Sequence, residues 1–379
     1  MSKKIRVAIL YGGKSGEHEV SLQSAASVLR HLDRNKYDPI PISIDKQGLW
    51  QFNDLTLIEN SKGKELPIFK NSPVVILATK ENGKTELTTL NSQDLPSLKN
   101  IDVFFPIIHG SFGEDGTLQG LLEMANTAYV GCGVLSSSVG MDKDVAKRLA
   151  KEAGVPIAPY INLRKEEWKK NPSLAKEQVK KNLQYPIFVK PANLGSSVGI
   201  HKVKKAEDLD SALRDAFSYD VKVLIEQGID AREIEVAVLE NLDFSKSPIV
   251  SAPSEVVTKG KYEFYSYDAK YLDENGAELI LPANLTKEQT IEAQKIAEDV
   301  FRSLECAGMA RVDLFLDRTT NKFYFNEINT IPGFTSISMY PRMMEHAGIP
   351  YPKLLDHLIE LALKHHTETQ ALKRDFQKN

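Results

Sequence analysis

The most informative stretch of this chain is RVDLFLDRTTNKFYFNEIN, residues 311–329. Polar and apolar residues alternate on both sides of a polar turn at 317–322, which predicts a β-hairpin. Because alternate side chains of a strand share one face, we expect a single face to carry the polar groups. That face is predicted to hold Arg311, Asp313 and Phe315 from the first strand and Phe323, Phe325, Glu327 and Asn329 from the second.

The charges on this hairpin predict a metal site. If Asp313 faces Glu327, then Arg311 faces Asn329, and two carboxylates oppose each other directly. Like charges in that position destabilise a sheet. A hard divalent cation such as Mg²⁺ accepts two carboxylates and a carboxamide while keeping coordination positions for phosphate oxygens. The alternative is a solvated polar face with an incidental register, since most charge runs are solvated.

The stretch VKPANLGSSVGI, residues 189–200, predicts a second hairpin whose loop can cradle phosphate, because Gly, Ser and Asn offer backbone N–H groups and hydroxyls. It is not a Walker A motif: GxxxxGK[ST] is absent, and the loop joins strand to strand. Lys190 ends the preceding strand and Lys143 begins a helix predicted over 142–153, so both can act as point charges toward phosphate. An ordinary hairpin turn is the alternative for the loop taken alone.

The first third of the chain alternates between strands and helices. IRVAIL at 5–10 precedes a Gly-Gly pair and a helical repeat, and DVFFPIIHG at 102–110 precedes a loop and another helix. This order predicts a parallel, doubly wound sheet whose ligands collect at the carboxyl ends of its strands, where Glu17 and His109 lie. Glu17 can bind a substrate ammonium, while His109 can equally be a strand-end residue without a chemical role. The glycines lack GxGxxG spacing, so no dinucleotide fingerprint is present.

A length of 379 residues predicts two or three domains. We expect an N-terminal substrate-binding α/β domain at 1–135, a central unit with the Gly/Ser loop at 136–229, and a C-terminal unit with the metal hairpin at 230–379. The predicted fold class is α/β, with α+β character in the C-terminal half.

Composition excludes several classes of protein. The 48 Lys and Arg against 51 Asp and Glu give a net charge of −3, which offers no basic field for nucleic acid. No stretch approaches the ~20 apolar residues of a membrane helix, and the start MSKKIRVAIL lacks the apolar length and cleavage site of a signal peptide. Cys132 and Cys306 show no CxxC spacing and fit a reducing compartment. We therefore expect a cytoplasmic protein that binds neither nucleic acid nor membrane.

One long polar loop, KGKYEFYSYDAKYLDENG at 259–276, has an unusual aromatic content. Its tyrosines are Tyr262, Tyr265, Tyr267 and Tyr271. Scattered surface aromatics are one interpretation. A polar loop so rich in rigid aromatics is more typical of a lid that expels water from a site when it closes.

Together these motifs make the sequence similar to the ATP-grasp ligases, and within them to the D-alanine–D-alanine ligase family. The resemblance covers nearly the whole chain and includes GGKSGEHEVSL, HGSFGEDGTLQG, GMDKDVAK, FVKPANLGSSVG, LIEQGIDAREIEVAVL, YDAKYL, GMARVDLFLD and FNEINTIPGFTSISMYP. It implies an ATP-grasp fold behind the doubly wound N-terminal domain. It also implies ATP-dependent joining of two D-alanines for peptidoglycan synthesis, two Mg²⁺ or Mn²⁺ ions, a monovalent cation such as K⁺, and a homodimer.

The resemblance further implies a role for each matching residue. The metal ligands are Asp313, Glu327 and Asn329. The residues that contact ATP are Lys143, Lys190, Ser197, Glu226, Gln227, Ile229, Glu233 and Lys270, with the lysines on phosphate, Glu226 at the adenine and Glu233 at the ribose. The segment Gln-Gly-Ile at 227–229 departs from the Lys-Trp-Leu of shorter members, so only a general adenine-edge role carries over to it.

The same resemblance implies a reaction through an acyl phosphate. Glu17, Ser196 and Tyr271 would form a hydrogen-bonded triad, with Glu17 on the ammonium of the first D-alanine. Arg311 and the Gly333 backbone N–H would stabilise the tetrahedral oxyanion. The remaining substrate contacts would come from His109, Ser338 and Met339.

Three other functions compete with this interpretation. A ligase of the same fold could use D-lactate or D-serine as acceptor, although Tyr271 argues against D-lactate because members that make the depsipeptide differ there. A nucleotide-binding regulator without catalysis is disfavoured because the metal ligands and phosphate lysines are all retained. A nicotinamide oxidoreductase is disfavoured by the missing fingerprint.

Overall fold

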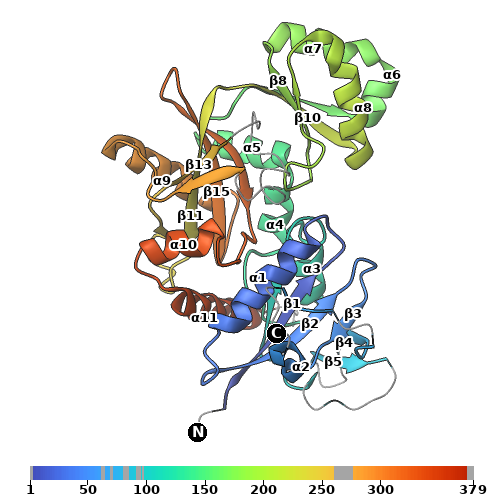
Figure 1. Cartoon of the computed structure of the whole chain (residues 1–379), viewed down its shortest axis with the longest axis vertical. Helices are drawn as coiled ribbons and strands as arrows, with labels where there is room; N and C mark the ends of the chain where they lie inside the picture. The colour runs from blue at the N-terminus through green and yellow to red at the C-terminus, as the bar shows by residue number, and fades with distance from the viewer. Residues whose placement is uncertain are drawn as a thin grey trace, which may run out of the picture.

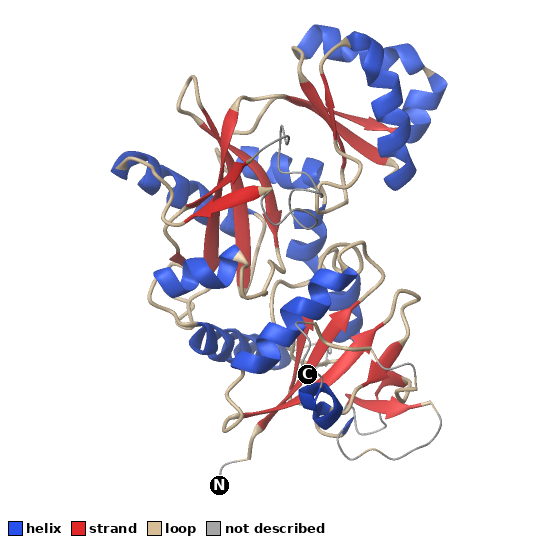
Figure 2. Ribbon diagram, viewed as in Figure 1, coloured by secondary structure: helices blue, strands red, loops and turns tan. Residues whose placement is uncertain are grey.

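The chain folds around three main β-sheets with helices packed against them, as Figure 2 shows. The computed structural model describes residues 3–60, 65–68, 71–79, 85–90, 95, 98–259 and 276–373. In Figure 1 the N-terminal sheet lies at one end of the molecule, the central sheet at the other, and the third sheet between them. Lys270 and Tyr271 of the predicted lid lie outside the described residues.

The N-terminal sheet confirms the predicted parallel arrangement, in the order β3-β2-β1-β6. β1 is parallel to both β2 and β6, and β3 pairs antiparallel with β2 at the edge. β6 is buried at every position, as expected for a parallel strand covered on both faces. The strands of this region are β1 (Ile5–Gly12), β2 (Tyr37–Ile44), β3 (Trp50–Phe52), β6 (Val103–Ile107) and a separate hairpin, β4 (Val75–Thr79) with β5 (Thr85–Thr89). Its helices are α1 (His18–His31), α2 (Leu55–Asn60) and α3 (Thr117–Met124).

The central sheet has the antiparallel order β7-β10-β8-β9. The pairing of β8 with β9 confirms the predicted hairpin around the Gly/Ser loop. The strands are β7 (Tyr160–Arg164), β8 (Ile187–Pro191), β9 (His201–Val203) and β10 (Lys222–Gln227). The helices of this unit are α6 (Lys165–Lys170), α7 (Pro172–Asn182), the 3₁₀ turn η2 (Ala206–Asp208) and α8 (Leu209–Tyr219).

The third sheet has the order β14-β13-β11-β15-β16, with β12 paired to β11. Its strands are β11 (Ala231–Leu239), β12 (Ile249–Val250), β13 (Ser254–Thr258), β14 (Ala277–Ile280), β15 (Met309–Asp317) and β16 (Phe323–Asn329). Its helices are α9 (Lys287–Ser303), α10 (Met339–His346) and α11 (Tyr351–Gln370). No helix in the described ranges is both long enough and apolar enough to cross a bilayer.

Two hydrophobic cores join parts of the chain that are distant in sequence. One combines β1, α1 and β6 with α10 and α11, and Figure 1 shows α11 beside α1. The other packs Ala146 and Ala150 against α9, β11 and β15. Those two alanines belong to α5 (Lys143–Glu152), which follows α4 (Val134–Met141). Because α5 is anchored on the third sheet, its lysines are held close to the β15–β16 hairpin.

The β15–β16 hairpin has the predicted register where it carries charge: Arg311 faces Asn329, and Asp313 faces Glu327. The predicted shared face is wrong for the second strand. A β-bulge shifts the register between Asp313 and Leu314, so that Leu314 pairs with Phe325. The intervening Asn326 is the extra residue of the bulge.

This bulge separates Phe323 and Phe325 from Glu327, three side chains that regular alternation would have put on one face. Phe323 and Phe325 are fully buried in the core. Asn326 and Glu327 both line a cavity on the opposite side. A bulge of this kind re-aims the side chains that follow it, which period-two alternation cannot anticipate.

We predict that Phe325→Ala lowers the free energy of unfolding by about 3–5 kcal/mol, because it empties a fully buried site. Phe315→Ala is the matched control, since Phe315 lines the cavity and is only partly buried. Urea denaturation measures both. Equal losses for the two variants would contradict the assignment of the two rings to opposite faces.

Candidate active site

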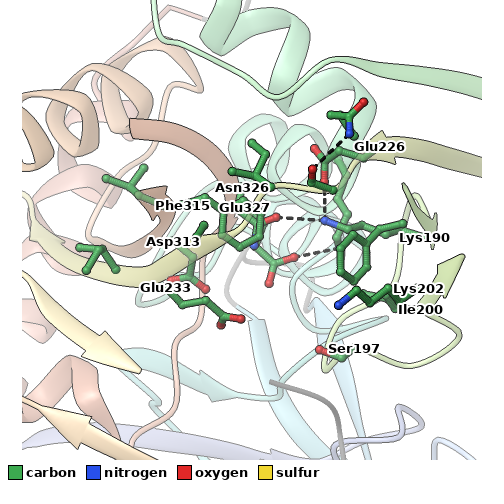
Figure 3. Close-up of a pocket in the computed structure, with 18 of the residues that line it drawn as sticks. Lys190, Ser197, Ile200, Lys202, Glu226, Glu233, Asp313, Phe315, Asn326 and Glu327 are labelled. Carbon is green, nitrogen blue, oxygen red and sulfur yellow. Dashed lines mark hydrogen bonds and ion pairs between the residues drawn. The ribbon is translucent and has the colours of Figure 1, made fainter. Parts of the chain in front are cut away.

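A cavity of about 500 Å³ opens between the central and third sheets, within the size range of small-molecule sites. Figure 3 shows side chains of both sheets around it. The predicted nucleotide residues that line it are Lys143, Lys190, Ser197, Glu226, Gln227, Ile229 and Glu233. The cavity therefore brings together residues that are up to 184 positions apart, from Lys143 to Glu327.

Arg311 and Asp313 both line this cavity and form an ion pair with each other. Arg311 donates to both carboxylate oxygens of Asp313, with Nε–Oδ1 and Nη2–Oδ2 distances of 2.7 Å. Arg311 Nε also lies 3.4 Å from Glu235 Oε1. Asn329 Nδ2 donates to Asp313 Oδ2 at 3.0 Å. This bidentate pairing fixes the guanidinium plane beside the hairpin.

Lys143 connects the hairpin to the Gly/Ser loop. Its Nζ lies 3.1 Å from Glu327 Oε2 and donates to the Leu194 carbonyl at 2.7 Å. Asp142 caps the first turn of α5 by accepting from two backbone N–H groups, which sets where Lys143 begins the helix. One ammonium thus contacts the predicted metal hairpin and the predicted phosphate loop.

The hairpin supplies oxygen ligands that suit Mg²⁺, but too few to complete its coordination without phosphate and water. Mg²⁺ usually binds through one or two carboxylates, with phosphate and water oxygens completing an octahedron. Asp313 and Glu327 supply two carboxylates, and Asn329 adds a carboxamide oxygen. Within the part of the chain that the structure describes, no three His, Cys, Asp or Glu side chains form a metal cluster. A cation here would therefore depend on nucleotide phosphate for its remaining ligands.

Glu226 is buried between two lysines. Its Oε1 lies 2.7 Å from Lys147 Nζ, and its Oε2 accepts from Lys190. Burial alone would raise the pKa of Glu226, but the charges of Lys147 and Lys190 outweigh it and lower the pKa. Lys190 also donates to Asn326 Oδ1 at 3.3 Å (Figure 3). Neither Lys147, the last residue of the GMDKDVAK motif, nor Asn326, which precedes Glu327 in the hairpin, was predicted as a site residue, because neither contact can be seen from the motif alone.

The side chain of Gln227 forms hydrogen bonds with the backbone of Gln184. It accepts from the Gln184 backbone N–H at 2.8 Å and donates to the Gln184 carbonyl at 2.8 Å. This pairing fixes the end of β10, so that the backbone from 227 to 229 lines the cavity rim.

The Gly/Ser loop reaches the N-terminal domain. Ser196 and Ser197 have left-handed backbones, with φ of 53° and 58°, a conformation that is costly outside glycine and persists where the surroundings enforce it. Ser196 Oγ donates to Glu17 Oε1. Two members of the predicted triad therefore meet, and the third, Tyr271, lies outside the described residues.

A second cavity of about 30 Å³ adjoins the first. Lys143 and Glu327 line both cavities. Glu17, Glu114 and Asn329 line the smaller one. A small polar pocket thus shares two charged walls with the larger, nucleotide-sized one.

His109 and Glu114 clamp the backbone of Ile331. Glu114 accepts from Ile331 N at 2.8 Å and from Gly110 N at 2.7 Å. His109 Nδ1 donates to the Ile331 carbonyl at 2.9 Å, and its Nε2 lies 2.9 Å from Ser24 Oγ. His109 is therefore a structural partner of the loop after β16. Glu114 was missed, although it lies in the same HGSFGEDG motif.

The clamp contains two groups with shifted pKa values. Burial lowers the pKa of His109, which fits a neutral ring that donates from Nδ1. Burial, followed by the charge of Glu17, raises the pKa of Glu114 to about 8.

The loop held by this clamp carries Gly333, Ser338 and Met339. A Cβ at Gly333 would lie 2.7 Å from Ser338 Oγ, so a side chain here would displace the Ser338 hydroxyl. Ser338 Oγ accepts from Thr335 N at 3.0 Å, and Met339 begins α10. The start of a helix offers N–H groups that favour a carboxylate.

Two sheets that enclose a nucleotide-sized cavity, one with carboxylates and the other with lysines, define the class of ATP-grasp ligases. The family models described as D-ala D-ala ligase N-terminus and D-ala D-ala ligase C-terminus match residues 6–132 and 149–360. D-alanine–D-alanine ligase A of Bradyrhizobium diazoefficiens is 54% identical over 376 residues, which is 99% of this chain and 100% of the relative. The chain belongs to the D-alanine–D-alanine ligase family.

Solved structures agree with this family and with the ATP-grasp fold. The D-alanine–D-alanine ligase from Coxiella burnetii superposes with a TM-score of 0.80 at 35% identity, covering 97% of each chain. VanG D-Ala:D-Ser ligase from Enterococcus faecalis superposes with a TM-score of 0.79 at 34% identity, covering 95% of this chain and 100% of that one.

We predict that Glu114→Gln removes a pH dependence of stability. The folded pKa of about 8 exceeds the unperturbed 4.5, so the contribution of Glu114 is complete below pH 4.5 and is lost as the pH rises toward 8. The wild type should lose up to ~4 kcal/mol relative to the variant across this window. Urea denaturation from pH 5 to 9 measures the difference. The exposed Glu152→Gln serves as control, and a constant difference for Glu114→Gln would contradict the prediction.

Proposed function

We propose that this chain catalyses the ATP-dependent joining of two D-alanines to D-alanyl-D-alanine, with release of ADP and phosphate, for peptidoglycan precursor synthesis. The chain belongs to the D-alanine–D-alanine ligase family, and one structural observation supports the proposal further. The larger cavity and the small cavity beside Glu17 are both lined by Lys143 and Glu327. A γ-phosphate at that shared wall would lie next to an amino acid held by Glu17.

In the first step, a carboxylate oxygen of the first D-alanine attacks the γ-phosphorus and ADP leaves, forming a D-alanyl phosphate. This step needs positioning and charge neutralisation rather than a protein nucleophile. Lys143, Lys190 and Lys270 would hold phosphate oxygens, with Ser197 in the same loop. Glu17 would bind the substrate ammonium, and its hydrogen bond with Ser196 supports that orientation.

In the second step, the neutral amine of the second D-alanine attacks the acyl carbon. Arg311 and the Gly333 N–H would stabilise the resulting oxyanion, the amine loses a proton, and phosphate leaves. Ser338 and the start of α10 at Met339 would bind the second carboxylate. Tyr271 would complete the triad with Glu17 and Ser196, and the His109–Glu114 clamp keeps the Gly333 loop in place.

Asp313, Glu327 and Asn329 would hold two Mg²⁺ or Mn²⁺ ions. Such ions polarise phosphoryl oxygens and neutralise the charge that develops in phosphoryl transfer. We also propose that Glu226, Gln227 and Ile229 flank the adenine and that Glu233 meets the ribose.

Location and assembly belong to the same proposal. Use of ATP supports a cytoplasmic enzyme, and a homodimer and a K⁺ requirement follow from the family resemblance. Light scattering of the purified protein tests the dimer.

The acceptor is predicted to be D-alanine. Most amine is protonated at pH 7, so phosphate release from ATP should rise toward alkaline pH if an amine is the nucleophile. Phosphate release is measured with D-alanine, L-alanine, D-serine and D-lactate. D-serine is tested separately because one structural relative, VanG, is a D-Ala:D-Ser ligase. Mixed D-alanyl-D-serine or depsipeptide as the main product at pH 7–8 would contradict the proposal.

The metal assignment predicts that Asp313→Asn and Glu327→Gln each lower kcat/KM by about 100-fold or more while the protein stays folded. Each change removes one charge needed to hold a divalent cation. Glu292→Gln, an exposed carboxylate on α9, is the control and should retain full activity. Turnover of either hairpin variant near the wild-type rate at ordinary Mg²⁺ would reject the assignment.

A further inference from the structure

We propose that Lys147 is a positioning residue that couples the base-binding edge of the nucleotide cavity to the metal-binding hairpin. The inference rests on the proposed function, because it takes Glu226 as the adenine contact and Glu327 as a metal ligand. Lys147 sits on α5 with its side chain only 1% exposed, so it acts behind the cavity wall.

A buried ammonium is costly unless its protons find acceptors. Lys147 Nζ forms an ion pair with Glu226, 2.7 Å from Oε1, and donates a hydrogen bond to the Phe325 carbonyl at 2.9 Å. It also lies 5.7 Å from the centre of the Phe325 ring, within cation–π range. The ammonium therefore bridges β10 and β16, two strands of different sheets.

Lys147 contacts β16 next to the bulge residue Asn326. Phe325 immediately precedes the extra residue Asn326 and the predicted ligand Glu327. Its N–H donates to the Pro156 carbonyl at 2.8 Å, and its carbonyl accepts from Lys147. Lys147 thereby fixes the backbone at the point where the strand turns Glu327 toward the cavity.

The contacts close into a ring. Lys147 binds one oxygen of Glu226 and Lys190 binds the other. Lys190 also donates to Asn326, which follows Phe325 in the chain. Figure 3 shows the contacts of Lys190 with Glu226 and Asn326. Because each member is held by its neighbours, a change at the Glu226 carboxylate is transmitted to the bulge through two routes. Glu226 and the bulge that precedes Glu327 are consequently joined by one network of ion pairs and hydrogen bonds.

This coupling predicts a specific effect on binding. Without the Lys147 ammonium, Glu226 loses a partner that orients its carboxylate toward a purine 6-amino group. The Phe325 carbonyl loses its donor at the same time. Nucleotide selectivity and metal affinity should therefore weaken together, which loss of packing alone would not produce.

The test uses Lys147→Met, which keeps an unbranched side chain of similar length and removes the charge. Calorimetry compares ATP with ITP, which has an oxygen in place of the 6-amino group, and electron paramagnetic resonance measures Mn²⁺ binding to the ADP complex. We expect at least about a fivefold loss in ATP-over-ITP preference and at least about a fivefold weaker Mn²⁺ affinity. Lys151→Met, an exposed lysine one turn along α5, should leave both unchanged.

A lower melting temperature with unchanged selectivity and Mn²⁺ affinity would overturn the coupling. Should Lys147→Met fail to fold, Glu226→Gln tests the same ring from its other end, and unchanged Mn²⁺ affinity in that variant would also overturn it. Neither readout requires D-alanine. Failure of D-alanine-dependent turnover in the wild type would therefore reject the proposed function, while the binding data decide the coupling separately.

Discussion

Two carboxylates that face each other across a β-hairpin impose the main constraint on this structure. Asp313 and Glu327 are direct cross-strand partners, and such like-charge pairs are destabilising unless cations offset them. Arg311 pairs with Asp313 from the same strand, and Lys143 reaches Glu327 from α5. Positive charge delivered by the rest of the fold therefore stabilises this hairpin.

That requirement links the three sheets. Lys143 also binds the Leu194 carbonyl, which ties the hairpin to the Gly/Ser loop of the central sheet. In the same loop, Ser196 donates to Glu17 of the N-terminal domain. A short series of contacts thus runs from the hairpin through the Gly/Ser loop to Glu17, and it brings the predicted site residues to one junction.

The sequence predicted the parts of the site that depend on motif and alternation. The register of Asp313 with Glu327, the Gly/Ser hairpin and the parallel N-terminal sheet are confirmed. The face of Phe325 was predicted wrongly, because a single bulge residue reverses the alternation and leaves no compositional trace.

The sequence also did not predict the roles of two buried ionisable residues, Lys147 and Glu114. Lys147 looks like any polar position of an amphipathic helix, and Glu114 looks like a loop carboxylate. Their roles come from partners 79 and 217 positions away, at Glu226 and Ile331. Only the fold brings such partners together, so the sequence alone could not identify them.

We propose that the hairpin carboxylates hold the metal at the junction of the two cavities. Anomalous diffraction from a crystal of the wild-type protein with Mn²⁺ and an ATP analogue would locate the ion. We expect anomalous density coordinated by Asp313, Glu327 and Asn329, next to the terminal phosphate. Density on other carboxylates, such as Glu233 or Glu235, with the hairpin left without metal, would contradict it.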